Sequence, residues 1–453
     1  MQQKLDGSVR LRDIGGLLAL GWLDGSCYGG ETWRQRRWEW QIRRRDLRGM
    51  TVTHIGACNS SSVAPQSGPG DLFQLLRDGI ARTKAEMSAL TGLARSTVAP
   101  RVNLLMNSGL VAPVGAATSS GGRPPSTFAF NPGARAVLAI DLGATHGNVV
   151  IADLDANILG IRRGHHQIDE GPQAVLEWAV ESALGLLHEI GRDPRDVVGV
   201  GVGVPGPVDH STGRPTNPPI MPGWDRFDVA AYIQHVFPGR VLVDNDVNLL
   251  AIGEQRGAWP EAMNLLYVKV ATGIGAGLIM NGELQRGAQG TAGDLGHVQV
   301  PYNASAGRPP DDERDLEALA SGPAIAAMLN AQGIPARTSR DVVALVRAGN
   351  AEAISATRQA GRDIGEVLAT CVNLLNPSII VIGGSLGESG EHLLAGVKET
   401  VYRRSIPLAT QYLRIVPSQS GPNAGALGAA VMVIQDVLSP ESIDSLVAEH
   451  LAS

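Results

Sequence analysis

Apolar residues recur at helical spacing between residues 69 and 112 and predict three short helices. Thr83 and Glu86 stand at capping-box spacing before the second helix, a turn at Thr91-Gly92 follows it, and Gly109 ends the third. Two short helices joined by a glycine turn are typical of a helix-turn-helix, whose second helix enters the major groove of DNA. The positions predicted to face inward are Leu72, Leu75 and Leu76 in the first helix, Met87, Leu90 and Leu93 in the second, and Val98, Val102, Leu105 and Met106 in the third.

Pro100 falls within the third of these helices. A proline in a helix interior loses a hydrogen bond and clashes with the preceding turn, at a cost of about 3 kcal/mol. The sequence therefore predicts a helix that begins late, with Thr97 as its N-cap, because first-turn N–H groups have no partner in any case. The candidate DNA-binding residues are then Arg95, Ser96 and Thr97 at the entrance of the helix and Arg101 one turn further on.

The stretch 116–128 (AATSSGGRPPSTF) is glycine- and proline-rich and predicts a flexible tip between two short strands. Such a hairpin beside a helix-turn-helix is a wing, and its Arg123 is a candidate for the minor groove, since arginine is favoured in narrow grooves. The alternative is a winged helix that serves only for protein interaction.

From residue 136 onward the pattern changes to buried strands that end in glycine turns. Helical stretches alternate with these strands, which is typical of an α/β fold. The predicted strands are 136–141, 148–154, 197–204, 240–243, 265–270 and 378–382.

Composition restricts the class of protein. The chain has 453 residues, 43% of them hydrophobic and 18% charged, which predicts two or three folded domains and excludes wholesale disorder. Three cysteines are too few and too scattered for a disulfide framework. Because no apolar run approaches the roughly 18 residues of a membrane helix, we expect a cytoplasmic protein with no membrane partner.

Charge is distributed unevenly along the chain. Residues 1–135 hold 17 Lys and Arg against 9 Asp and Glu, a balance of +8, and the remainder has a balance of −14. A basic front on an acidic body suits a nucleic-acid-binding module attached to a small-molecule domain. Much of the excess comes from arginines between residues 34 and 48, in a segment, 1–68, that we interpret as disordered or as an extension before the true start. No function is assigned to that segment.

Three glycine turns each follow a predicted strand, at 141–145, 271–277 and 382–385. Glycine lets backbone N–H groups close on phosphate oxygens, although tight turns also need glycine for steric reasons alone. Together with the acidic residues at 244–246, the turns favour a nucleotide-binding cleft. The candidate nucleotide-binding residues are Asp141, Gly143, Thr145, Thr272, Gly273, Gly383 and Gly384.

Residues 69 to about 435 resemble the ROK family, which groups sugar kinases with sugar-responsive transcriptional regulators. The resemblance rests on motifs in family order: the wing Gly-Gly-Arg-Pro-Pro, Pro205-Gly206-Pro207-Val208, and the stretches 243–254, 290–297, 316–317 and 321–322. It implies an α/β protein with a winged helix-turn-helix domain at 69–133. A two-lobed, actin-like (ribonuclease H-like) sugar-kinase body would follow at 134–453, with a sugar and, in the kinases, ATP between the lobes.

The resemblance also implies a set of sugar-binding residues. Asp246 matches the general base of the kinases, a role that applies here only if kinase activity remains. Asp294 stands where the kinases have Glu. Taken singly, Asp246 could cap its helix, His297 could be an ordinary core histidine and Glu317 could lie on a solvated face; their joint spacing favours a site. The implied sugar-binding residues are Asn245, Asp246, Asp294, His297 and Glu317.

Two departures from the family pattern change what we expect. The first phosphate turn has Ala144 and His146 where the kinases have a second glycine and usually a lysine, which argues against tight ATP binding. In the family, His297 joins nearby cysteines around a structural zinc, but 298–316 contains no cysteine. Because zinc needs about four good ligands, we expect no zinc or other metal here. We expect either another means of ordering this segment or a mobile loop near 309–312.

Three hypotheses follow. The leading one is a repressor that binds operator DNA and a sugar or sugar phosphate, as a homodimer or tetramer because two-fold operators require paired modules. The second is an active sugar kinase with an accessory DNA-binding module, for which the cofactor would be Mg-ATP. The third is an architectural DNA-binding protein, which leaves the acidic residues of the body without a role.

Overall fold

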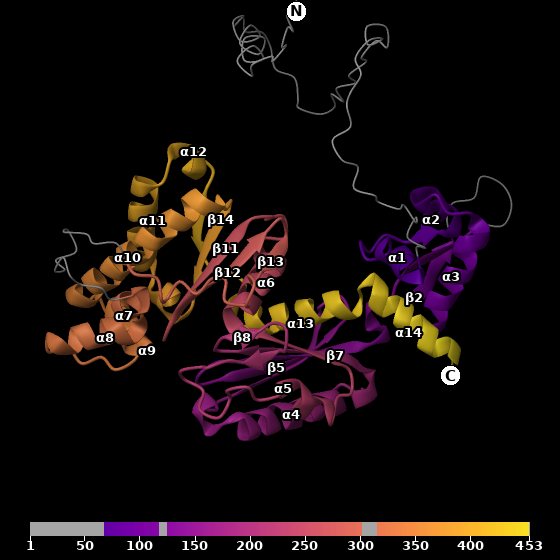
Figure 1. The fold of residues 1–453 in the computed structure, drawn as a ribbon, viewed down its shortest axis with the longest axis horizontal. Helices are drawn as coiled ribbons and strands as arrows, with labels where there is room; N and C mark the ends of the chain where they lie inside the picture. The colour runs from indigo at the N-terminus through magenta and orange to yellow at the C-terminus, as the bar shows by residue number, and fades with distance from the viewer. Residues whose placement is uncertain (1–67, 117–124, 301–314, 453) are drawn as a thin grey trace, which may run out of the picture. The chain divides into compact units, whose positions relative to one another are not determined.

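The computed structural model describes residues 68–116, 125–300 and 315–452 (Figure 1). Several sequence predictions lie outside these ranges: the interpretation of residues 1–67, the tip of the wing with Arg123, and the loop near 309–312.

Three helices and a three-stranded sheet form the N-terminal module, residues 68–135. The helices are α1 (Pro69–Gln74), α2 (Lys84–Thr91) and α3 (Arg95–Asn107), and the antiparallel sheet has the order β1 (Arg82–Thr83), β3 (Ser126–Phe130) and β2 (Val111–Ala116). The capping box of Thr83 and Glu86 is present, and Gly92 ends α2 with a φ of 73°. The three predicted helices and the two short strands after them, β2 and β3, are therefore confirmed.

Two details of the module correct the sequence predictions. α3 begins at Arg95 with Ala94 as N-cap, so Thr97 is not the cap and Pro100 lies inside the helix. Thr97 N and Val98 N both donate to Ala94 O, at 2.9 and 3.1 Å, so the first turn closes without a contribution from Pro100. The exposed proline costs the helix only the N–H that it lacks. Leu90 is 60% exposed instead of facing inward, whereas Met87 of the same helix is fully buried.

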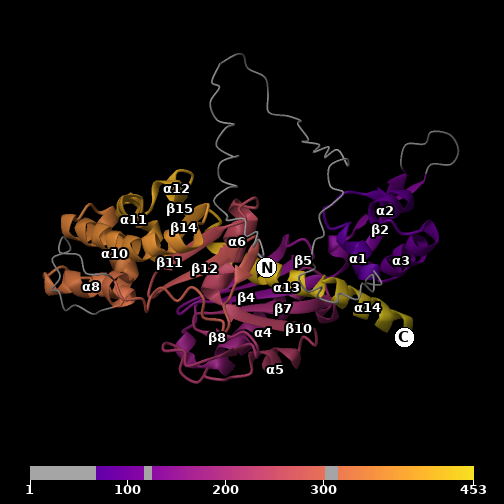
Figure 2. The ribbon, with the colours of Figure 1, turned by 45° about the horizontal axis from the view of Figure 1, so that its top comes forward.

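The first lobe is built on a five-stranded sheet with two parallel and two antiparallel neighbouring pairs. Figure 2 shows α4 (Pro172–Glu189) and α5 (Val229–Gln234) along the sheet. Leu138 and Ile140 pack with these two helices, while Val137 and Ala139 on the other face pack with α13 (Ala424–Val437). The strand order is β10 (Arg240–Asn245), β7 (Val197–Val204), β4 (Ala136–Leu142), β5 (Gly147–Asp153) and β6 (Ile158–Gly164).

The second lobe is built on another five-stranded sheet. Leu265 and Tyr267 pack with α6 (Asp246–Ala258), while Leu266 and Val268 on the other face pack with the outer helices. The strand order is β13 (Glu283–Gln285), β12 (Ile274–Met280), β11 (Leu265–Val270), β14 (Ile379–Gly383) and β15 (Arg414–Pro417). The outer helices are α7 (Leu316–Ala320), α8 (Gly322–Ala331), α9 (Ser339–Arg347), α10 (Ala351–Leu375), α11 (Glu391–Arg404) and α12 (Pro407–Thr410).

Both sheets follow one plan. In each, the first strand of the lobe lies at the centre, an antiparallel meander adds two strands on one side, and two later strands add in parallel on the other. This repeated order is the ribonuclease H-like, actin-like architecture that the resemblance implied. The predicted turn at 271–277 is shorter in the structure, because Gly275 and Gly277 belong to β12 and only 271–273 is a turn. Gly277 is required by close packing, since a Cβ there would lie 2.5 Å from the Cβ of Ala251.

The module shares its core with the first lobe. One hydrophobic cluster contains Leu72 and Phe73 of α1, Val137 of the first sheet, Leu249 of α6, and residues of α13 and α14 (Pro440–Ala452). Hydrogen bonds reinforce this packing, from Gln74 Nε2 to Leu438 O at 2.8 Å and from Gly70 N to Asp444 Oδ1 at 2.7 Å. No single helix of the described residues is long and apolar enough to cross a membrane, although the bent pair Gly421–Val437 and Pro440–Glu449 meets the length and composition test together.

Candidate functional site

The N-terminus of α6 carries Asn245 and Asp246, the first two of the implied sugar-binding residues. Asn245 is the N-cap: its Oδ1 accepts a hydrogen bond from Val247 N at 2.9 Å, and its Nδ2 donates to Gly206 O at 3.0 Å. The Pro205-Gly206-Pro207 motif therefore contacts this helix end. Asp246 is buried and pairs with Lys269 Nζ of β11 at 2.5 Å.

A second ion pair joins the two lobes beside the first. Asp244, at the end of β10, accepts hydrogen bonds from Arg286 Nε at 2.7 Å and from Asn248 Nδ2 at 2.8 Å. Asp244 is 4% exposed, so its charge is nearly excluded from water. Arg286 follows β13 of the second lobe. This pair therefore fixes the end of β10 in the first lobe to the second lobe.

Asp141 adds a third carboxylate to this region. Its Oδ2 accepts a hydrogen bond from Asn148 Nδ2 at 3.2 Å, and burial, reinforced by the charge of Asp246, raises its pKa to about 6. Burial opposes the charge on Lys269, but Asp246 and Asp141 outweigh it and raise the pKa of this lysine. Lys269 is thus the cation that two neighbouring carboxylates share, a role that the sequence analysis missed.

The other three implied sugar-binding residues form a separate cluster in the second lobe. His297 Nδ1 lies 3.3 Å from Asp315 Oδ2, and this hydrogen bond, together with the nearby charge of Asp294, raises the pKa of His297. Glu317 Oε2 accepts a hydrogen bond from Ile274 N at 2.9 Å. His297 and Asp294 are exposed, whereas Glu317 is half-buried against Gly273 and Gly296.

The β11–β12 hairpin links the two clusters. Lys269 on β11 pairs with Asp246, and Ile274 at the start of β12 holds Glu317. Asn245 and Asp246 therefore lie at the start of α6 and Glu317 on α7, while Asp294 and His297 lie in the stretch between β13 and α7. Their carboxylate, amide and imidazole groups are suited to hydrogen bonds with sugar hydroxyls, which are stronger when one partner is charged.

The glycine turns give mixed support for a nucleotide site. In the first turn Gly143 N donates to His146 O at 2.8 Å, and a Cβ on Gly143 would lie 2.8 Å from the His146 ring, so the imidazole covers the turn. Burial lowers the pKa of His146, as do the charges of Lys269 and Arg340. Thr145 and Thr272 are exposed.

The remaining candidate glycines are explained by close packing. A Cβ on Gly273 would lie 2.7 Å from Glu317 Oε2, one on Gly383 would lie 2.0 Å from Tyr267 Oη, and one on Gly384 would lie 2.5 Å from Val270 O. A steric role accounts for these three residues without a phosphate.

The structural zinc of the family does not fit this chain. His297 makes its hydrogen bond to Asp315, and the following stretch offers no thiolate. Within 68–116, 125–300 and 315–452, no group of three or more His, Cys, Asp or Glu side chains is arranged to hold a metal ion.

Four of the candidate DNA-binding residues lie on α3. Arg95 and Ser96 are exposed in its first turn, and Thr97 and Arg101 are half-buried. Lys84 at the start of α2 donates to Asn103 Oδ1 at 3.1 Å, which joins the two helices across the turn. The module thus presents the start of α3 to solvent.

The comparison with protein families decides the identity of the body. The model of the ROK family matches residues 137–436. This chain belongs to the ROK family. The Xylose repressor of Bacillus spizizenii is 29% identical over 360 residues, which cover 79% of this chain and 92% of the repressor.

Solved ROK structures share the fold. A ROK family transcriptional regulator, a homologue of the E. coli Mlc protein, superposes on 84% of this chain and 98% of its own with a TM-score of 0.69 and 22% identity. The ROK hexokinase from Thermus thermophilus covers 66% of this chain and 99% of its own with a TM-score of 0.56 and 29% identity. The regulator thus matches more of this ROK protein than the hexokinase does.

Sequence reasoning missed the partners of the acidic residues. Lys269 is the one charged residue in the apolar strand 265–270, and a lone charge in a buried strand is a signal that could have been used. Asp315, which both caps α7 and holds His297, precedes the Leu316-Glu317 motif directly. Arg286 lies in no motif and has no such signal.

Proposed function

We propose that this ROK protein is a sugar-responsive transcriptional repressor. One observation carries the proposal: the match to the Xylose repressor covers 79% of this chain, well beyond the 66% that the hexokinase covers. A ROK body with a helix-turn-helix in front of it is suited to regulation. The kinase body by itself accounts for no residue of the N-terminal module.

The DNA-binding surface in this proposal is the start of α3. Arg95 and Ser96 would face the major groove, with Thr97 and Arg101 beside them and Arg123 directed to the minor groove. Arginine is the commonest reader of base edges, while hydroxyl groups mainly fix the protein on phosphates. Because two-fold operators need two modules, we expect a homodimer or a dimer of dimers, which light scattering in solution would test.

The sugar in this proposal binds around Asp246. Asn245 and Asp246 at the N-terminus of α6 would form hydrogen bonds with its hydroxyl groups. Asp294, His297 and Glu317 would do the same from the second lobe. Lys269 and Arg286 hold the acidic groups from the second lobe, so a sugar there would favour one arrangement of the lobes over another. The module packs into the core of the first lobe, which provides a route from sugar binding to DNA affinity.

The decisive experiment is fluorescence anisotropy of the chain on its own upstream DNA with excess nonspecific competitor. It is repeated with free and phosphorylated sugars, beginning with xylose and N-acetylglucosamine. We expect specific binding that one sugar shifts by tenfold or more. Asp246→Asn should abolish the sugar response and keep DNA binding, and Arg95→Gln should do the reverse. Binding without sequence preference would contradict the proposal.

A kinase remains the second candidate because Asp246 is retained at the start of α6 and a ROK hexokinase is 29% identical to this chain. Two features oppose it: Asp246 is engaged by Lys269 at 2.5 Å, and the imidazole of His146 covers the first turn. Release of ADP from Mg-ATP with any sugar of the panel, lost in Asp246→Asn, would establish kinase activity. We expect no such release above background.

A further inference from the structure

A cavity of about 390 Å³ lies where the N-terminal module meets the body. We call it the joint cavity. Its volume falls within the range of small-ligand sites. Five parts of the chain contribute to it: the end of α1 with the residues that follow it, the end of β3, the turn between β5 and β6, the last turn of α6, and α13. The polar side chains that line it are Gln74, Arg77, Asp78, Asp155, Arg256 and Gln435.

Two arginines from opposite sides of the joint share one carboxylate in this cavity. Arg256 Nη2 of α6 donates to Asp155 Oδ1 at 3.1 Å, and Arg77 Nη1 of the module donates to Gln74 Oε1 at 3.2 Å. Asp78 is held elsewhere, by two hydrogen bonds of 2.7 and 2.5 Å from Arg82. The pair of guanidinium groups therefore exceeds the available negative charge by one.

The electrostatics of Arg77 support this reading. Burial lowers the pKa of Arg77, and the neighbouring charge of Arg256 lowers it further, against the opposing effect of Asp155. Arg77 is half-buried and Arg256 is exposed. Two neighbouring cations that repel each other are stabilised by an anion placed between them. Guanidinium groups in addition offer paired N–H donors that match the oxygens of phosphate.

The groups around the cavity are held in place from both sides. Asp153 Oδ1 accepts hydrogen bonds from Asp155 N and Asn157 N, each at 2.9 Å, which fixes the turn that carries Asp155. Gln74 Nε2 donates to Leu438 O at 2.8 Å, which fixes the end of α1. An anion would therefore meet a preformed site, and less free energy would be spent on ordering it.

We propose that the joint cavity binds a small phosphate-bearing anion between Arg77 and Arg256, and that the bound anion strengthens the contact between the module and the body. None of the implied sugar-binding residues lines this cavity, so the site is separate from that of the proposed function. A ligand here would act on the module directly.

The test is isothermal titration calorimetry of the full chain in a buffer free of phosphate and sulfate. The probes are inorganic phosphate and glucose 6-phosphate, with glucose as the neutral control. We expect saturable binding of both phosphates, at least tenfold weaker in Arg77→Gln and in Arg256→Gln. Arg195→Gln, an exposed arginine outside the cavity, should bind as the unchanged chain does, and so should Asp246→Asn. Tighter binding of glucose 6-phosphate would identify a phosphorylated metabolite as the source, and equal affinity would identify free phosphate.

Three results would overturn the proposal. One is the absence of saturable phosphate binding, and another is equal affinity in the glutamine variants. Arg77→Lys keeps the charge and should retain part of the affinity, so it separates loss of the site from loss of folding, which circular dichroism would monitor. The third result that would overturn the proposal is displacement of phosphate by operator DNA, together with an Arg77→Gln variant that binds DNA as weakly as Arg95→Gln does. That result would assign the cavity to the DNA interface.

Discussion

The two lobes share one strand order, but charge plays a different part in the packing of their helices. In the first sheet, β7 alternates valine with glycine; Gly199 and Gly201 face α13, and Gly203 faces α6. A Cβ on Gly201 would lie 2.2 Å from Ala429 O, and one on Gly199 would lie 2.6 Å from Val433 Cγ2. The helix therefore approaches the strand almost backbone to backbone, and shape alone determines the fit.

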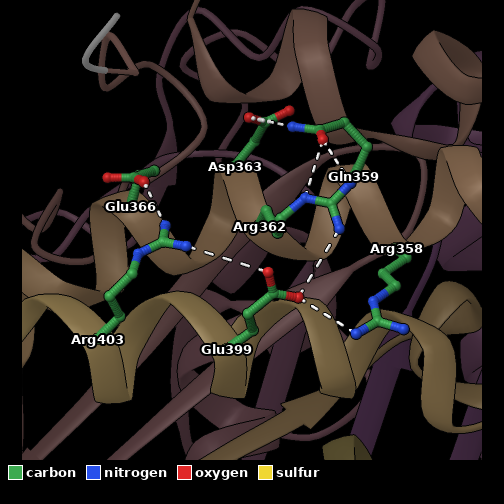
Figure 3. Close-up of polar contacts among 7 residues, drawn as sticks. All are labelled: Arg358, Gln359, Arg362, Asp363, Glu366, Glu399 and Arg403. Carbon is green, nitrogen blue, oxygen red and sulfur yellow. Dashed lines mark hydrogen bonds and ion pairs between the residues drawn. The ribbon is translucent and has the colours of Figure 1, made fainter. Parts of the chain in front are cut away.

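The outer layer of the second lobe combines close packing with charge: a Cβ on Gly361 of α10 would lie 2.2 Å from Leu393 O of α11. Figure 3 shows α10 and α11 joined by a network of arginines and carboxylates. Glu366, which is 2% exposed, pairs with Arg403 at 3.5 Å and also with Arg404, and Glu399 lies 3.3 Å from Arg358. One connectivity thus supports close packing in one lobe and close packing with an added buried ionic network in the other. The two interfaces should therefore respond differently to pH and salt.

The steric interface should give the largest loss of stability. Gly201→Ala places a methyl group against a backbone carbonyl that cannot rotate away, so we expect at least about 3 kcal/mol of lost unfolding free energy. Urea unfolding would measure it. Gly160→Ala in β6 of the same sheet is the matched control, because its nearest neighbour is a flexible Leu186 side chain at 3.3 Å. A loss below 1 kcal/mol at Gly201 would contradict the comparison.

The buried carboxylate of the second lobe should come next. Glu366→Gln removes the charge that Arg403 and Arg404 share, and loss of a charge-assisted hydrogen bond costs about 2 kcal/mol. Because the carboxylate is buried, added salt should change this loss little. Urea unfolding at low and high salt would measure both effects. If the variant were as stable as the unchanged chain, the network would be peripheral to the fold.

The sequence predicted the sheets well because their signals are local. Long apolar runs such as 197–204 and 265–270 match strands β7 and β11 residue for residue. The predicted start of α3 was wrong because the rule for Pro100 considers one residue, whereas the hydrogen bonds of Thr97 N and Val98 N to Ala94 O already close the first turn. A single-residue rule thus missed the backbone hydrogen bonds that begin the helix.

The candidate site was predictable only in part. The motifs located Asp246, His297 and Glu317, but the pairing of Asp246 with Lys269 spans 23 residues and that of Asp244 with Arg286 spans 42. These pairs depend on which strands lie next to each other in the fold. The sequence around either residue does not indicate this.

A smaller effect on stability should come from Asp141 of the candidate site. It should depend on pH, which distinguishes it from the effects at the two interfaces. The pKa of Asp141 is raised to about 6 in the folded chain, so the protonated form stabilises the fold. That contribution is complete below about pH 4 and is lost as the pH rises through 6. Asp141→Asn stays neutral and should be more stable than the unchanged chain at pH 7.5, by about 1 to 2 kcal/mol for this half-buried group. Thermal unfolding at pH 4, 6 and 7.5 would show whether the difference grows as the pH rises; a constant difference would contradict it.

The smallest effect should come from the exposed edge of the ionic network. Arg358 and Glu399 are 51% and 39% exposed at their side chains, so water and salt screen the pair. Exposed ion pairs contribute roughly 0 to 1 kcal/mol, and we expect Arg358→Gln to cost less than about 0.5 kcal/mol, with no cost in high salt. Comparison with Glu366→Gln in one urea series would separate the buried and exposed ends of one network. Equal losses of unfolding free energy in the two variants would mean that the network acts as a unit. The contribution of each ion pair would then not depend on how deeply it is buried.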